Sequence, residues 1–112
     1  MNKGIALYLQ HILESAGLVA EYIKDKSQKD FLADIQLQDS VIRRIEIIGE
    51  AAKKIPDDFR KKHPAIPWRN IAGMRDIIVH EYFGIDLKLV WTVAKRDLPR
   101  LKKQLTGIQL SR

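Results

Sequence analysis

Apolar residues recur at helical spacing along most of the chain. One series runs from Ile5 to Ile23 in steps of four and three residues, a second from Val41 to Ile55, and a third from Leu87 to Leu105. Steps of this kind place apolar side chains along one side of an α-helix. The three series are Ile5, Leu9, Ile12, Ala16, Val19 and Ile23; Val41, Ile45, Ile48, Ala52 and Ile55; and Leu87, Trp91, Ala94, Leu98, Leu101 and Leu105. With no alternating strand pattern beside them, they predict a bundle with three long helices.

Shorter helices are expected between the second and third series and around residue 30. Ser27 is a suitable N-cap for the segment QKDFLADI, because its hydroxyl can accept a hydrogen bond from a free backbone N–H. Pro56 suits the first turn of PDDFRKKH, where its missing N–H would have no partner. The stretch HPAIPW then interrupts the chain, and a helix is predicted to restart near Pro67.

The last long helix should contain an irregularity. Gly84 is predicted to end the helix that starts near Pro67, and Asp86 to cap the next one. Pro99 falls inside that final helix, and because it lacks an N–H we expect a bend or loosened hydrogen bonding one turn earlier. The pattern as a whole predicts an all-α, up-and-down bundle that forms one domain over residues 1–112.

The composition excludes several kinds of site. The chain has no cysteine, so neither disulfides nor a thiolate zinc site can form. No apolar run approaches the roughly 18 residues that cross a bilayer, and the N-terminal stretch lacks a small-residue cleavage site. These observations predict a cytoplasmic protein that does not bind membranes, and the small core favours oligomerisation.

Positive charge gathers in two blocks. The formal net charge is +6, and residues 53–75 and 95–112 carry the excess of Lys and Arg. Such blocks attract polyanions, of which nucleic acid is the commonest in cytoplasm, although a solvated surface or a charge-rich tail would look the same. The candidate RNA-binding residues are Lys53, Lys54, Arg60, Lys61, Lys62 and Arg69.

The stretch MRDIIVHEYFGID, residues 74–86, is rich in reactive side chains. At 100° per residue, Arg75 falls in the middle of an apolar face with Trp68, Ile71 and Tyr82 around it. A guanidinium in that position is costly unless it is paired or meets a partner surface. This layout suggests a helix that faces both its own bundle and a second copy of the chain across a two-fold axis.

Asp76 and His80 form an i, i+4 pair on the flank of that face, where the carboxylate can orient the imidazole. A histidine that gives or takes a proton and an arginine that binds phosphate suit RNA cleavage by the ribose 2′-hydroxyl. A metal site is not expected, because Asp76 and His80 have no third ligand at helical spacing. The competing interpretation is a surface pair and a structural tyrosine with no catalytic role.

Arg75, His80 and Tyr82 fit the pattern Arg, four residues, His, any residue, Tyr, with an acidic residue directly after the Arg. This pattern resembles the HEPN superfamily. Three longer blocks, LQDSVIRRIEIIGEAAKKI, HPAIPWRNIAGMRDIIVHEYFGID and VWTVAKRDLPRLKKQL, are similar to the HepT family of ribonuclease toxins over roughly residues 5–105. Three blocks in the same order are far more specific than the short motif alone.

The resemblance implies an all-helical HEPN-type bundle that forms a homodimer and cleaves RNA without a metal or other cofactor. Arg75 and His80 would be the ribonuclease residues, with Asp76 in support. It further implies a type VII toxin–antitoxin system, in which an MNT-type nucleotidyltransferase antitoxin transfers AMP from ATP to Tyr82. The alternative is a non-catalytic helical dimer that binds RNA or the nucleotidyltransferase.

Glu50 is a further candidate, since it lies near the apolar stripe of the second long helix and beside Gly49. It can be interpreted as the partner that holds Arg75 in the cleft. The other interpretation is an exposed residue that contacts Lys54 one turn later.

Overall fold

The computed structural model describes residues 2–80 and 86–110, and within this part of the chain all regular structure is helical. The elements, in chain order, are α1 (Lys3–Ile23), α2 (Gln28–Leu32), α3 (Ile35–Lys53), α4 (Asp57–Lys62), α5 (Trp68–His80), α6 (Leu87–Thr92), the π-helical turn η1 (Val93–Asp97) and α7 (Leu98–Leu110). The all-α prediction is therefore confirmed. None of the described helices is long and apolar enough to cross a membrane.

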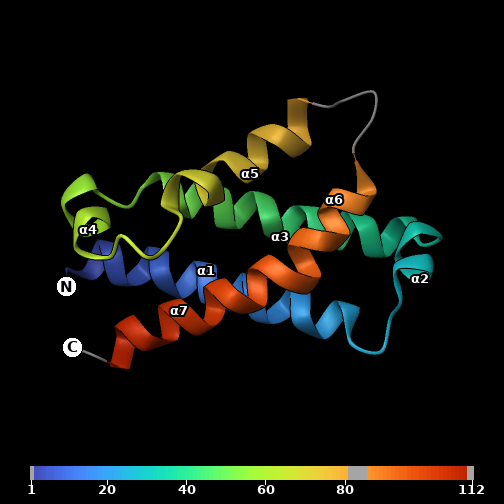
Figure 1. The fold of residues 1–112 in the computed structure, drawn as a ribbon, viewed down its shortest axis with the longest axis horizontal. Coiled ribbons are helices and arrows are strands. Elements are labelled where there is room, and N and C mark those ends of the chain that lie inside the picture. Colours follow the sequence, from blue (N-terminus) through green and yellow to red (C-terminus); the bar gives the residue numbers. More distant parts are fainter. Residues whose placement is uncertain (1, 81–85, 111–112) are drawn as a thin grey trace.

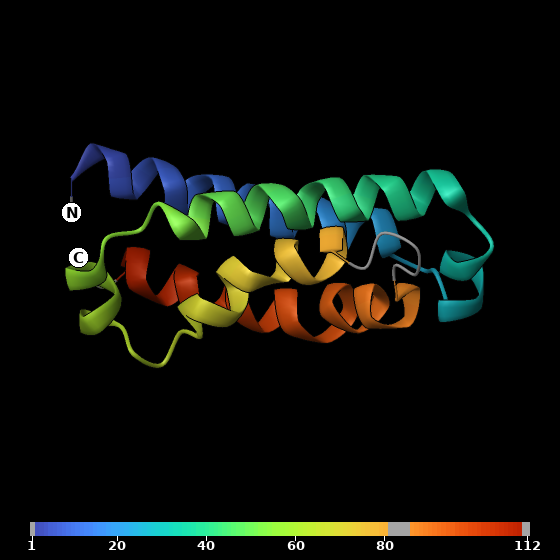
Figure 2. The ribbon, with the colours of Figure 1, turned by 90° about the horizontal axis from the view of Figure 1, so that it is seen from above.

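The long helices form an elongated bundle of 42 × 29 × 21 Å. Helix α3 runs alongside α1, and α5 packs on α3, while α7 packs on α1 (Figure 1). Seen from above, α5 lies over the line of η1 and α7 (Figure 2). The short helices cover the two ends, with α4 near the start of α1 and α2 at the opposite end. The result leaves α5 at the side of the bundle, between α3 and α7.

The apolar series predicted from the sequence form the core. Every member of the first two series is buried, and the third is buried from Ala94 onward. In the first part of the third series, however, Leu87 and Trp91 are only half-buried, and Val90 and Val93 take the buried positions. The buried face of α6 is thus shifted by one residue relative to the predicted pattern.

The π-helical turn explains that shift. Its closing hydrogen bond runs from the N–H of Leu98 to the carbonyl of Val93, which encloses one residue more than an α-helical turn. Pro99 follows directly and has no N–H for the carbonyl of Lys95, so the regular ladder cannot continue there. The loosened turn predicted one turn before Pro99 is confirmed. The inserted residue moves Val90 to where Trp91 would lie in an uninterrupted helix, and it leaves both Val93 and Ala94 buried.

Side-chain caps fix the starts of the helices. Ser27 and Asp30 form a reciprocal capping box at α2, in which the Ser27 N–H donates to the Asp30 carboxylate and the Ser27 hydroxyl accepts from the Asp30 N–H. Hydrogen bonding to Ser27, first of all from its backbone N–H, holds the pKa of Asp30 below its ordinary value. Asp86 accepts from the N–H of Leu89 at 3.1 Å, as predicted. Pro56 is the N-cap of α4 and not a residue of its first turn, because its ψ of 152° is extended. The predicted stop at Gly84 lies outside the described residues.

Gln38 is a buried polar residue that ties α2 to α3. Its Nε2 donates to the carbonyl oxygens of Phe31 at 2.9 Å and Leu32 at 3.2 Å. Phe31 is fully buried, and its ring lies 5.5 Å from that of Trp91 on α6. One amide group therefore satisfies the end of α2 and holds a core aromatic residue in place.

We predict that Gln38→Leu lowers the free energy of unfolding by about 1–3 kcal/mol, because the carbonyl oxygens of Phe31 and Leu32 would lose the hydrogen bonds from this buried amide. Gln36→Leu, on the exposed side of the same helix, is the matched control and should change stability by less than about 0.5 kcal/mol. Urea denaturation of both variants measures the difference, and equal effects would contradict the assigned role of Gln38.

Candidate functional site

Helix α5 carries the predicted motif, and its first half belongs to the core. Trp68 is 5% exposed and Ile71 is 1% exposed. The indole Nε1 of Trp68 donates to the carbonyl of His63 at 3.0 Å, which fixes the loop before the helix. The apolar stripe was expected to face both its own bundle and a partner, and these two residues form the part that packs within the protomer. A partner surface would have to come from later positions on the stripe.

The motif residues share one helix only in part. Arg75 and His80 both lie within α5, with His80 as its last residue. Their side chains, and all of Tyr82, lie outside the described residues. The helix bounds agree with the predicted start near Pro67 and place Arg75 one turn beyond Ile71.

Asp76 is the motif residue whose side chain is described. Its Oδ1 lies 3.4 Å from the Nζ of Lys53, the last residue of α3. The two side chains are 47% and 40% exposed, so the bridge is solvated and contributes at most about 1 kcal/mol. It nevertheless directs the Asp76 flank of α5 toward α3. Lys53, predicted to bind RNA, thus already has a carboxylate neighbour.

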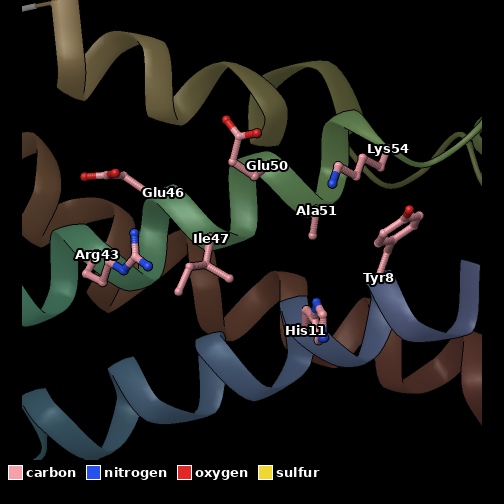
Figure 3. Close-up of a pocket in the computed structure, with 8 residues that line it drawn as sticks. All are labelled: Tyr8, His11, Arg43, Glu46, Ile47, Glu50, Ala51 and Lys54. Atoms are coloured by element: carbon pink, nitrogen blue, oxygen red, sulfur yellow. The ribbon is translucent and has the colours of Figure 1, made fainter. Parts of the chain in front are cut away.

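Glu50 lies one turn before Lys53 on the same helix. Figure 3 shows its carboxylate on the side of α3 where α5 lies, and directed away from Lys54. The Nζ of Lys54 instead lies 5.8 Å from the centre of the Tyr8 ring on α1. This arrangement favours the interpretation that Glu50 faces the motif helix over the interpretation that it contacts Lys54.

A groove of about 350 Å³ lies on the outer side of the bundle, along the line where α1 and α3 meet (Figure 3). Its polar lining consists of Tyr8, His11, Arg43, Glu46, Glu50 and Lys54. The two carboxylates offset the two cations, so this groove has no clear preference for an anion. His11, which had no partner in the local sequence, lies in this groove and far from α5 in the fold.

Arg60 has a structural role that the sequence did not reveal. Its Nε donates to the carbonyl of Ile55 at 2.9 Å, and its guanidinium nitrogen donates to that of Ala52 at 2.7 Å. Ala52 lies in the last turn of α3 and Ile55 just beyond its end, where backbone carbonyls lack regular helical partners. Arg60 is half-buried there. Its proposed RNA contact would compete with these bonds, whereas Lys61, Lys62 and Arg69 are exposed and remain candidates.

A second groove lies between α5 and the segment formed by η1 and α7, and its volume is also about 350 Å³. Its polar lining is Asn70, Arg96, Asp97, Arg100 and Gln104. None of the six basic residues nominated from the sequence lines it. The basic block at residues 95–112 was the signal for this groove, but only the three-dimensional packing shows which of its side chains lie beside α5.

Metal binding has no support among the described residues, which contain no group of three or more His, Asp or Glu side chains that could hold an ion. Asp76 is directed to Lys53, and a cation is a poor neighbour for a metal ligand. The described part of the site therefore offers charge and hydrogen bonding as its chemistry.

Comparison with known proteins matches this chain, over residues 12–108, to a family described as ribonuclease HepT-like. A Thermococcus cleftensis protein named "Probable ribonuclease HepT" is 48% identical over 91% of this chain and 93% of its own length. A Methanocaldococcus jannaschii protein named "Gamma-glutamylcyclotransferase and putative RNase" is 54% identical over 96% of this chain. The match spans about half (49%) of that protein's length. No solved structure matches significantly.

We predict that Arg60→Ala lowers the free energy of unfolding by about 1.5–3 kcal/mol, because it removes two charge-assisted hydrogen bonds at the end of α3. Lys61→Ala, on the same short helix but exposed, should stay within about 0.5 kcal/mol of the wild type. Chemical denaturation followed by circular dichroism separates the two. Wild-type stability in Arg60→Ala would show that the bonds to Ala52 and Ile55 do not matter.

Proposed function

Because the chain belongs to the HepT-like ribonuclease family, we propose that it is a metal-independent endoribonuclease that acts as the toxin of a type VII toxin–antitoxin system. The observation that carries the proposal is the match over residues 12–108, which includes the whole of α5 with Arg75 and His80. The basic character of the chain fits a polyanionic substrate. RNA in the cytoplasm is the substrate we propose.

The active site is proposed to be shared between two copies of the chain. On a straight α-helix, Arg75 and His80 are about 140° apart, so one helix does not direct both toward the same phosphate. A two-fold axis beside the second half of α5 would bring the arginine of one protomer toward the histidine of the other. The buried positions of Trp68 and Ile71 are consistent with this, because they anchor the first half of α5 in its own bundle.

The reaction needs only groups that this motif supplies. The ribose 2′-oxygen forms a bond to phosphorus while the bond to the 5′-oxygen of the next nucleotide breaks. His80 takes the proton of the 2′-hydroxyl or gives one to the leaving oxygen, with its partner copy in the complementary role. Arg75 neutralises the charge that develops on the phosphoryl oxygens. The products are a 2′,3′-cyclic phosphate and a 5′-hydroxyl.

Asp76 is proposed to support this site by position and not by direct contact with RNA. Its carboxylate lies 3.4 Å from Lys53, which links the motif helix to the end of α3. The same carboxylate is four residues before His80, within reach of an imidazole on the next turn. Asp76 is therefore suited to orient His80, while the ion pair with Lys53 limits the movement of the Asp76 side chain.

The proposed regulator is an MNT-type nucleotidyltransferase that transfers AMP from ATP to the hydroxyl of Tyr82. Attack by the phenolic oxygen on the α-phosphorus forms the phosphodiester and releases pyrophosphate. A nucleotide attached two residues after His80 would add bulk and negative charge next to the cleft. RNA would then be excluded both sterically and electrostatically.

We predict that purified protein cleaves RNA in the presence of EDTA and leaves 2′,3′-cyclic phosphate ends, and that His80→Ala or Arg75→Ala lowers the rate by about 100-fold or more. His11→Ala, which alters a histidine in the groove between α1 and α3, is the matched control and should retain the rate. Gel electrophoresis of a labelled RNA and mass spectrometry of the ends measure both quantities.

Loss of cleavage in EDTA would exclude the metal-independent mechanism. If the wild type binds RNA or the nucleotidyltransferase and cuts nothing, with Arg75→Ala and His80→Ala unchanged in both properties, the non-catalytic dimer is the correct function.

We predict that incubation with the nucleotidyltransferase and ATP increases the intact mass of the chain by whole AMP units, and that Tyr82→Phe abolishes the increase. The chain has three tyrosines, so Tyr8→Phe and Tyr22→Phe are matched controls that should still be modified. Intact-mass spectrometry reads all four proteins, and a modified Tyr82→Phe variant would refute the assignment.

A further inference from the structure

We propose that the groove between α5 and the η1–α7 segment binds the phosphate backbone of single-stranded RNA and leads the strand to Arg75. This inference rests on the proposed ribonuclease function and names a surface that recognises its substrate. The groove has a volume of about 350 Å³ and lies directly beside the motif helix. Met74, which precedes Arg75, is part of its wall.

The charges in the groove favour an anion. Arg96 and Arg100 line it, against the single carboxylate of Asp97. Both arginines are exposed and sit one turn apart along the same side of the η1–α7 segment. A rise of about 6 Å over four residues is comparable with the spacing of successive phosphates in an extended strand. Guanidinium groups bind phosphate oxygens in a bidentate manner, so two adjacent phosphates have two matched partners.

The groove has a direction. The Nε2 of Gln104 donates to the carbonyl of Ala65 at 3.1 Å. The end of the groove at Gln104 therefore lies against the loop that precedes α5. Helices α5 and α7 run in opposite directions in Figure 1. Arg96 and Arg100 are therefore nearer to the Met74 end, and Gln104 is nearer to Pro67. The positive charge is concentrated at the end that borders Arg75.

The apolar surface of the groove suits a nucleic acid as well. Ile71 and Leu101 form its buried floor, and Met74 is half-buried in its wall. A thioether side chain adapts its shape to ribose and base surfaces. The groove between α1 and α3 lacks this combination, since Glu46 and Glu50 offset its two cations. Between the two grooves of equal volume, only the one beside the motif helix carries a net positive charge.

The turn before Pro99 helps to create this arrangement. The π-helical turn η1 ends at Asp97 and contains Arg96, so the extra residue in the turn sets the direction of Arg96 relative to Arg100. Arg96 is restrained there, because its Nε lies 3.0 Å from the carboxylate of Asp97. Asp97 thus orients the guanidinium but also repels phosphate. Its removal should strengthen RNA binding.

The test measures binding to a 5′-labelled RNA of twelve nucleotides in which every ribose is 2′-O-methylated, so that binding is recorded without cleavage. The groove variant is Arg96→Gln with Arg100→Gln, which removes two charges and keeps much of each side chain's apolar stem. We expect its affinity to fall about tenfold near 0.1 M salt, and the slope of log affinity against log salt to fall by about 1.4, the amount for two phosphate contacts on a single strand.

The matched control is Lys24→Gln with Lys26→Gln, which removes the same charge at the distant end of α1. It should keep both the affinity and the salt slope. Asp97→Asn should bind the RNA several times more tightly than the wild type. Thermal unfolding of each variant verifies that the fold is retained.

Equal affinity in the groove variant and the wild type would overturn the proposal, as would an equal loss in the two double variants. Displacement of the RNA by poly-L-glutamate at the same charge concentration would show that the groove accepts an acidic polypeptide and would also overturn it. The ribonuclease proposal is judged separately. If the groove variant alone loses RNA binding and the wild type does not cleave unmodified RNA, RNA binding by the groove is supported and the ribonuclease proposal is wrong.

Discussion

The structure depends on the packing of α3 against helices on two of its sides. Val41, Ile45, Ile48 and Ala52 on this helix are completely buried, with α1 on one side and α5 on another. Burial of each large aliphatic side chain contributes about 1.5–3 kcal/mol, whereas an exposed ion pair such as Lys53 with Asp76 contributes at most about 1 kcal/mol. Apolar packing therefore decides where α5 lies. The ion pair only sets which flank of α5 faces α3.

A second constraint comes from one missing N–H group. Pro99 cannot supply the hydrogen bond that would continue the α-helix, and the chain responds with a π-helical turn at residues 93–97. The extra residue exchanges Trp91 for Val90 on the buried face and frees Trp91 to pack against Phe31 of α2. The same turn carries Arg96 into the groove beside α5. A local backbone requirement thus affects both the core and the surface next to the motif.

Much of the fold follows from the sequence because its helices are amphipathic and its caps are local. The first two apolar series are buried as predicted, and Ser27 and Asp86 cap the helices expected of them. The spacing of Arg75 and His80 likewise placed both on one helix. The cleft proposed between two copies would depend on a partner chain, and no pattern within a single chain determines that arrangement.

What the sequence missed depends on contacts between distant segments. The sequence predicts Arg60 to be a surface cation, but the turn that follows α3 brings its guanidinium to the carbonyls of Ala52 and Ile55. The sequence assigns Arg96 and Arg100 to a basic block but does not say what that block faces. In the structure, α7 runs back along α5, and both arginines line the groove between them. Net charge shows that an anion is attracted. Only tertiary packing shows which side chains can meet it.

The two flanks of α5 differ in charge, and this difference bears on how RNA can approach. Among the side chains that the structure describes on the α3 side, the carboxylates of Glu50 and Asp76 lie with the cation Lys53, and the Nζ of Lys54 lies near the Tyr8 ring. On the α7 side, two guanidiniums accompany one carboxylate. Over the short distances that salt leaves unscreened, the net positive charge of the second flank attracts phosphate. A strand bound in the proposed groove would therefore reach Arg75 from the α7 side.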